Sequence, residues 1–156
     1  MNSDTDRQDL LLVCSAGGHL AQLMAVRSWW SRHDRRWVTA DLPDVRARLQ
    51  GEDVIFAHFP TTRNVLNLLR NFAVAFRVLR ERRPDVIVSD GAAVAVPFFV
   101  IGWLIGVPTV YIEGFDRIDT ASVTGRICYH LTKNFCVQSD GQLAVYPKAT
   151  VIGPML

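Results

Sequence analysis

The sequence predicts an α/β fold: a single Rossmann-like domain in which a parallel sheet carries helices on both faces. Two observations support this prediction. Apolar runs of strand length alternate along the chain with stretches of helical periodicity, and such alternation is typical of βαβ units. The chain has 156 residues, 49% of them hydrophobic, which suffices for the core of one domain and argues against overall disorder.

Seven runs have the length and composition of strands, namely 10–14, 37–40, 54–58, 85–89, 109–112, 135–138 and 150–152. Five stretches between them repeat apolar residues at helical spacing, namely 18–30, 42–49, 64–82, 92–105 and 122–132. We expect residues 10–156 to form the domain. Residues 1–9 are polar and carry both signs of charge, so we expect them to be disordered and not to act as a signal peptide.

The segment 92–112 contains no charged residue and is long enough to span a bilayer. Pro97 and Pro108 interrupt it, and Gly106 precedes Pro108 in a pattern that is typical of a helix end. A buried helix followed by a buried parallel strand accounts for the same composition. We favour this buried arrangement, with a membrane-inserted segment as the alternative.

The charge and cysteine content narrow the class of protein. The formal net charge of +2 implies no general attraction to nucleic acid. The three cysteines are scattered, and no pair has metal-ligand spacing. We therefore expect no metal site, no disulfide framework and a cytoplasmic location.

The first candidate site is the loop Ser15-Ala16-Gly17-Gly18-His19, which follows the first predicted strand and opens a predicted helix. Backbone N–H groups at a helix N-terminus bind anions, and glycines let an oxyanion approach closely. Ser15, Gly17 and Gly18 are therefore candidate phosphate ligands. His19 either caps the helix, is simply exposed to solvent, donates to a phosphate or removes a proton from an attacking hydroxyl.

Two later strand ends repeat this pattern. Ser89 and Gly91 flank a turn between a strand and a helix, where Asp90 either caps that helix or binds a ligand hydroxyl. Glu113 follows the strand 109–112, and it either binds a substrate hydroxyl, pairs with Arg117 or caps the strand end. Because ligands of doubly wound sheets bind beyond the carboxyl ends of the strands, we expect these turns to face one crevice.

The helix predicted at 64–82 carries a basic row. Arg70 and Arg77 are seven residues apart and share a face, and Arg63 extends the row. An apolar stripe accompanies it, made of Leu66, Leu69, Phe72, Ala73, Phe76 and Leu79. This face is either a solvated surface or one that rests on anionic lipid headgroups.

Together these features resemble the Alg14 family and its bacterial relatives in exopolysaccharide synthesis, the PssD/CpsF-like proteins. The resemblance extends from about residue 10 to the C-terminus. It is carried by the segments 15–19, 62–64, 83–89, 91–97, 111–113, 122–125, 146–147 and 151–153. Each segment is weak alone, but the set in this order is specific.

The resemblance implies the acceptor-binding half of a MurG-type GT-B glycosyltransferase. An Alg13-like partner subunit then binds most of the UDP-sugar donor, UDP-N-acetylglucosamine or another UDP-hexose, and no cofactor is expected. The acceptor is a polyprenyl-diphosphate-linked saccharide, with its diphosphate at Gly17, Gly18 and the turn 89–91. His19 deprotonates the acceptor hydroxyl, and Glu113 orients the sugar.

The same resemblance implies a peripheral protein at the cytoplasmic face of the membrane, which recruits its partner there and docks it through Gly153, Met155 and Leu156. Two departures from the family pattern stand out. Ser139 follows Val137-Gln138 where family members commonly have tryptophan, and residues 1–9 lack the membrane helix of the eukaryotic members.

Two other functions remain as alternatives. One is a non-catalytic scaffold for the membrane and a partner. The other is a stand-alone nucleotide-binding Rossmann protein, which is disfavoured because the loop 15–19 is not Gly-x-Gly-x-x-Gly. Asp41 is the nearest candidate for a ribose-binding carboxylate in that case.

Overall fold

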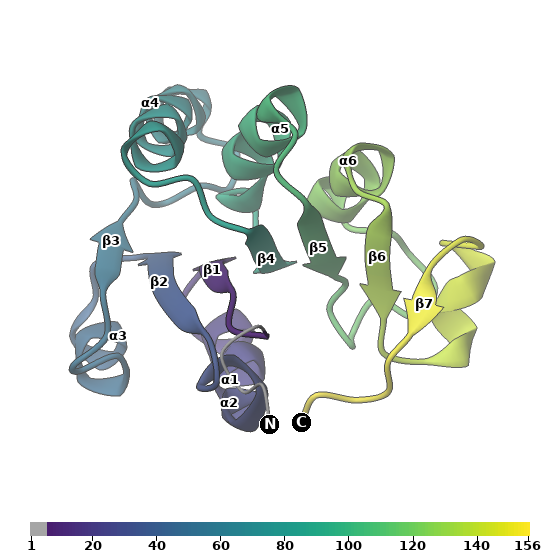
Figure 1. Cartoon of the computed structure of the whole chain (residues 1–156). Coiled ribbons are helices and arrows are strands. Elements are labelled where there is room, and N and C mark those ends of the chain that lie inside the picture. The colour runs from purple at the N-terminus through teal and green to yellow at the C-terminus, as the bar shows by residue number, and fades with distance from the viewer. Residues whose placement is uncertain (1–5) are drawn as a thin grey trace.

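A computed structural model describes residues 6–156. Over these residues, parallel strands form a single sheet in the order β3-β2-β1-β4-β5-β6-β7 (Figure 1). The strands are β1 (Asp9–Cys14), β2 (Asp34–Thr39), β3 (Val54–Phe56), β4 (Val86–Gly91), β5 (Thr109–Ile112), β6 (Asn134–Val137) and β7 (Thr150–Val151). The strand order reverses between β1 and β4, which places the topological switch point beside both glycine turns.

Helices cover both faces of the sheet, which confirms the predicted fold class. The helices are α1 (Gly18–Ala25), α2 (Arg27–Trp30), α3 (Pro43–Arg48), α4 (Val65–Glu81), α5 (Ala95–Ile105), α6 (Val123–Leu131) and the 3₁₀ helix η1 (Asp140–Ala144). Figure 1 shows α4, α5 and α6 on one face and α1, α2 and α3 on the other. Each face has its own apolar cluster, so the sheet separates two cores.

The apolar segment 92–112 forms α5 and β5 as expected, and α5 is buried or half-buried except for its last turn, where Trp103, Leu104 and Ile105 are exposed. Phe98 and Phe99 are fully buried against the sheet. Gly106 ends α5 in the left-handed conformation with φ 75°. Among residues 6–156, no helix has the length and hydropathy needed to cross a membrane.

The helix predicted at 18–30 divides at Val26 into α1 and α2. The indole Nε1 of Trp30 donates to the carbonyl of Leu23 at 2.7 Å. Trp30 is also buried edge-on against Trp37 of β2. The Leu23 carbonyl thus accepts a hydrogen bond from the indole, whereas in a continuous helix it would accept one from the backbone N–H four residues later. Burial of the large indole favours this arrangement.

Strand β2 begins at Asp34, three residues before the predicted start, because its two arginines have partners. Arg35 makes a bidentate pair with Glu52 at 2.7 Å. Arg36 donates to the carbonyl of Arg82 at 2.7 Å. The sequence pattern did not indicate η1 either, which is held by buried glutamine contacts described below.

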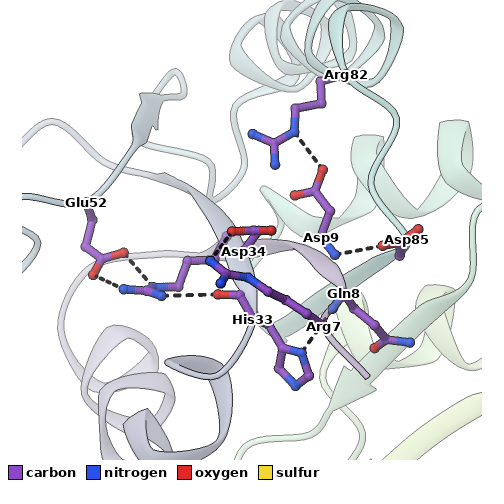
Figure 2. Close-up of polar contacts among 9 residues, drawn as sticks. Arg7, Gln8, Asp9, His33, Asp34, Glu52, Arg82 and Asp85 are labelled. Atoms are coloured by element: carbon purple, nitrogen blue, oxygen red, sulfur yellow. Dashed lines mark hydrogen bonds and ion pairs between the residues drawn. The ribbon is translucent and has the colours of Figure 1, made fainter. Parts of the chain in front are cut away.

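Residues 7–9 also differ from expectation, because the structure places them in defined contacts and not in a disordered tail. Asp9 already belongs to β1. Ion pairs and hydrogen bonds hold the segment, namely Arg7–Asp34, Gln8–His33, Asp9–Asp85 and Asp9–Arg82 (Figure 2). Residues 1–5 of the segment expected to be disordered lie outside the described residues.

The second face of the sheet is covered unevenly. Figure 1 shows α1, α2 and α3 packed on the β1–β3 side, with the C-terminal segment passing near β6 and β7. An apolar groove of about 450 Å³ lies along the other strands of this face. Its lining includes Trp29, Val88, Val110, Ile112 and Met155.

Candidate functional site

A pocket of about 530 Å³ opens at the carboxyl ends of the central strands. His19 contributes from α1, and Gly91 with Ala92 and Ala93 from the end of β4. The remaining lining comes from Tyr111, 61–63, 113–114, 116–117 and 122–124. Four residues singled out from sequence therefore meet here, namely His19, Arg63, Gly91 and Glu113.

The two glycine turns are in direct contact, as their positions on adjacent strands predicted. Ser15 donates its backbone N–H to the carbonyl of Gly91 at 3.3 Å. Gly17 caps α1 with φ 74°, a conformation that favours glycine. Gly17 and Gly18 are exposed at the helix N-terminus, next to the part of the pocket that His19 lines.

Ser89 is placed differently from the prediction. Its side chain is fully buried, and its Oγ accepts the N–H of Gly91 at 3.1 Å. The hydroxyl therefore shapes the turn from inside the sheet and is not accessible to a phosphate. Gly91, Ala92 and Ala93 line the pocket at this turn.

His19 lies against the turn at the end of β4. Its Nδ1 is 3.5 Å from Oδ2 of Asp90, whose side chain is 0% exposed. The Asp90 carboxylate raises the pKa of His19, outweighing the opposite effect of burial. Burial in turn raises the pKa of Asp90 to about 6, although the His19 ring opposes that change.

Glu113 is a buried side chain in the wall of the pocket and is extensively hydrogen-bonded. Its carboxylate accepts the backbone N–H groups of Gly114 and Ser122 at 3.1 and 3.3 Å and the Ser122 hydroxyl at 3.0 Å. The Tyr146 hydroxyl donates to Oε2 as well. Ser122 also caps α6 by accepting the N–H of Gly125 at 2.8 Å. Glu113 therefore joins the end of β5 to the N-cap of α6 and to the segment that follows η1, a role that the sequence pattern did not indicate.

The loop before α4 brings Arg63 to the pocket. Two buried asparagines of α4 hold that loop: Asn71 bonds both the N–H and the carbonyl of His58, and Asn67 donates to the carbonyl of Pro60 at 2.8 Å. Arg63 has φ 51° and is exposed. In the sequence, this anchoring is indicated by Asn67 and Asn71, which are four residues apart on a helix face that is otherwise apolar.

Arg70 and Arg77 lie away from the pocket, on the exposed side of α4. The predicted apolar stripe of this helix is divided between two faces. Its exposed members include Leu66, Leu69 and Phe76. Leu79 is the member of the predicted stripe that is buried, and the other core-facing residues are Asn67, Asn71, Val74, Ala75 and Val78. The basic row therefore shares its face with large apolar side chains that solvent reaches.

The C-terminal segment lies at the apolar groove rather than at the pocket. Met155 lines the groove, and its N–H donates to Oε1 of Gln138 at 3.0 Å. Gly153 turns the chain with φ 82°, and Leu156 is exposed.

Three buried glutamines, Gln22, Gln138 and Gln142, form a cluster that the sequence analysis did not predict. Gln138 also holds the C-terminal segment, through the Met155 N–H. Gln138 donates to Gln22 at 2.7 Å and to the carbonyl of Glu113 at 3.0 Å. Gln142 donates to the carbonyl of Gly114 at 2.8 Å. These bonds connect α1 and η1 to the ends of β5 and β6. They therefore hold in place the loop that begins at Glu113 and Gly114 and lines the pocket.

Two further observations concern ligands. Within the described range 6–156, no group of three His, Cys, Asp or Glu side chains is placed to hold a metal ion. Asp41, the candidate ribose ligand of a nucleotide-binding protein, is exposed and paired with Arg46 at 2.5 Å.

Comparison with solved structures identifies the class of fold. MurG of Acinetobacter baumannii superposes with a TM-score of 0.75 at 15% identity, over 94% of this chain and 45% of that one. The chain thus spans less than half the length of that enzyme. The fold is the Rossmann-like domain found in GT-B proteins.

Sequence comparison gives the family. The family model described as "Oligosaccharide biosynthesis protein Alg14 like" matches residues 10–155, so the chain belongs to the Alg14 family. The human UDP-N-acetylglucosamine transferase subunit ALG14 is 25% identical over 96% of this chain and 84% of its own length. A Colwellia psychrerythraea enzyme named as a pyrophosphoryl-undecaprenol N-acetylglucosamine transferase is 25% identical over 97% of this chain and 44% of that protein.

Proposed function

We propose that this chain is the acceptor-binding subunit of a two-chain glycosyltransferase that transfers N-acetylglucosamine from a UDP donor to a polyprenyl-diphosphate-linked saccharide. Membership of the Alg14 family carries the proposal, because a human relative is named as a UDP-N-acetylglucosamine transferase subunit. The Colwellia relative, whose name contains pyrophosphoryl-undecaprenol, supports the choice of acceptor class.

The pocket fits the acceptor side of such a reaction. The exposed N-terminus of α1 with Gly17 and Gly18 offers backbone N–H groups to a diphosphate, and Arg63 adds a positive charge at the rim. His19, which lines the pocket, is the proposed base that takes a proton from the acceptor hydroxyl. Glu113 lines the same wall, and its hydrogen bonds to Ser122 and Tyr146 support a role in shaping the sugar site.

The exposed face of α4 is the proposed membrane surface. Leu69 is 61% exposed beside Arg70, and Phe76 beside Arg77 repeats the pair two turns later. Apolar side chains that enter the lipid interface next to arginines that meet anionic headgroups favour peripheral binding. Leu69→Glu should abolish flotation with phosphatidylglycerol vesicles, and Arg46→Glu on α3 is the control. Equal flotation of both variants would remove this part of the proposal.

The apolar groove beside Met155 is the proposed docking surface for the Alg13-like partner, which supplies most of the UDP-sugar site. Parallel sheets are normally covered on both faces, and this groove is lined by Val88, Val110 and Ile112 of the sheet. We expect the tail residues Gly153, Met155 and Leu156 to contact the docked subunit, which would cover the part of this sheet face that no helix covers.

The proposal is tested by isolating the tagged full-length chain with its bound partner from native membranes. The preparation is supplied with radiolabelled UDP-N-acetylglucosamine, and label in the polyprenyl-diphosphate lipid fraction is measured. His19→Ala should reduce incorporation about 100-fold or more, because general-base catalysis contributes about 10²–10⁴-fold. Met155→Asp should instead reduce the amount of partner recovered.

His130→Ala, on the exposed side of α6, is the matched control for His19→Ala. Incorporation unchanged by His19→Ala, with normal partner recovery, would instead identify the chain as a non-catalytic scaffold. Tight binding of UDP by the isolated chain would favour the nucleotide-binding alternative.

A further inference from the structure

Asp90 is a buried carboxylate that the proposed function leaves unused. Its side chain is 0% exposed, and neither carboxylate oxygen has a hydrogen-bond partner among residues 6–156. Buried polar atoms are nearly always hydrogen-bonded, and an unpaired buried charge is costly. The position therefore requires an explanation other than packing or helix capping.

The Asp90 carboxylate, which accepts no hydrogen bond in the described residues, faces a ring nitrogen that makes none either. Nδ1 of His19 is buried, lacks a hydrogen bond within the described part of the chain, and lies 3.5 Å from Oδ2 of Asp90. A small movement of the ring would make this contact a charge-assisted hydrogen bond. Such bonds are often long in a free enzyme and shorten when the substrate binds.

Gly91 fixes how the ring lies. A Cβ at this position would come within 2.7 Å of His19 Cε1 and 3.2 Å of Nδ1, so the imidazole packs directly on the glycine backbone. With Nδ1 buried on the Asp90 side, Nε2 is the ring nitrogen left for the pocket that His19 lines.

We propose that Asp90 is the positioning residue for His19, holding a proton on Nδ1 so that the lone pair of Nε2 faces the acceptor hydroxyl. The inference rests on the proposed transferase function. In the transfer, the hydroxyl proton passes to Nε2, and the oxygen electron pair forms a bond to C1 of the donor sugar. The bond from C1 to the nucleoside diphosphate breaks, and its electron pair leaves with the diphosphate. Asp90 stabilises the imidazolium that results.

Other titratable groups face this pair. Asp116, after β5, also raises the pKa of His19. Cys14 of β1 is buried beside Asp90, and burial with that neighbouring charge raises the pKa of its thiol. Arg63, Glu113 and Arg117 line the same pocket. Removing the Asp90 charge should therefore lower the pKa of His19, while removal of the Asp116 charge should have a smaller effect.

The proposal is tested by NMR of the full-length chain labelled with ¹⁵N at its four histidines, with His19 assigned from the His19→Gln spectrum. We expect neutral His19 to carry its proton on Nδ1 and to titrate above about 6.5. Asp90→Asn should move the titration midpoint to lower pH and remove the tautomer preference. Asp116→Asn should move it less and preserve the tautomer.

A wild-type His19 protonated on Nε2, or an Asp90→Asn midpoint equal to that of the wild type, would overturn the proposal. The wild-type tautomer needs no variant, so a folding defect in Asp90→Asn cannot hide the answer.

A second measurement connects the pair to catalysis in the chain purified with its partner. Asp90→Asn should lower kcat about 10- to 100-fold, less than the loss of the base itself, which contributes about 10²–10⁴-fold, with little change in KM for UDP-N-acetylglucosamine. The acid limb of the pH profile should move to lower pH, whereas a merely structural defect would lower the rate at every pH. Because the NMR result does not depend on turnover, a failure of the transferase assay and a failure of this inference are distinguishable.

Discussion

Two buried carboxylates on neighbouring strand ends of this protein have opposite surroundings. Glu113 after β5 is 2% exposed and accepts hydrogen bonds from Gly114, Ser122 and Tyr146. Asp90 at the end of β4 is 0% exposed and has the His19 ring at 3.5 Å as its ion-pair partner. The first carboxylate is saturated with donors, whereas the second depends on one ionisable neighbour.

The difference indicates how the two residues contribute. A saturated buried carboxylate stabilises the loops that donate to it, since removing it leaves several donors unpaired. A poorly partnered carboxylate costs stability when ionised and is typical of sites where charge is used in chemistry. Glu113 therefore organises the pocket wall, and Asp90 acts on the imidazole.

The largest expected effect on stability follows from Glu113→Gln. The amide replaces one acceptor oxygen by an NH₂ group that faces the donors of Ser122 and Tyr146. We expect the free energy of unfolding to fall by about 3 kcal/mol, because this is the typical cost when buried donors lose the charged group to which they were hydrogen-bonded. Urea denaturation followed by circular dichroism measures it.

Tyr146→Phe provides the graded control for this substitution. It removes one donor and leaves the bonds from Ser122 and Gly114 in place, so a loss of about 1 kcal/mol is expected. A Glu113→Gln variant as stable as Tyr146→Phe would show that the carboxylate is not the anchor of this wall.

A smaller and pH-dependent effect is expected for Asp90→Asn. The folded-state pKa of Asp90 is raised to about 6, above its value of about 3.9 in unfolded chains. The stability that its protonated form contributes is present below about pH 4 and is lost as pH rises through about 6. The variant should therefore match the wild type near pH 4 and exceed its unfolding free energy by about 2 kcal/mol near pH 7.

Urea denaturation of both proteins from pH 4 to pH 8 measures this difference. A variant that is less stable than the wild type at pH 7 would mean that Asp90 is a structural anchor like Glu113. The contrast between the two carboxylates would then be lost.

Much of the fold was predictable because strands and helices have different periodicities. The predicted strand 109–112 coincides with β5, and α4 lies inside its predicted range with Asn64 as its N-cap. The exceptions involve side chains that act across the fold. Trp30 divides a helix by bonding Leu23, and Gln142 holds η1 by bonding Gly114.

For the site, the sequence by itself determined which turns meet. Parallel strands with helical crossovers bring their carboxyl ends to one edge, so His19, Gly91 and Glu113 were expected together and line one pocket. Only the tertiary structure decided the role of each carboxylate. The partners of Glu113 come from the N-cap of α6 and the segment after η1, and the partner of Asp90 comes from α1, at sequence separations that local patterns do not encode. The hydrogen bonds that reach a buried oxygen depend on packing between distant segments, which forms only when the chain folds.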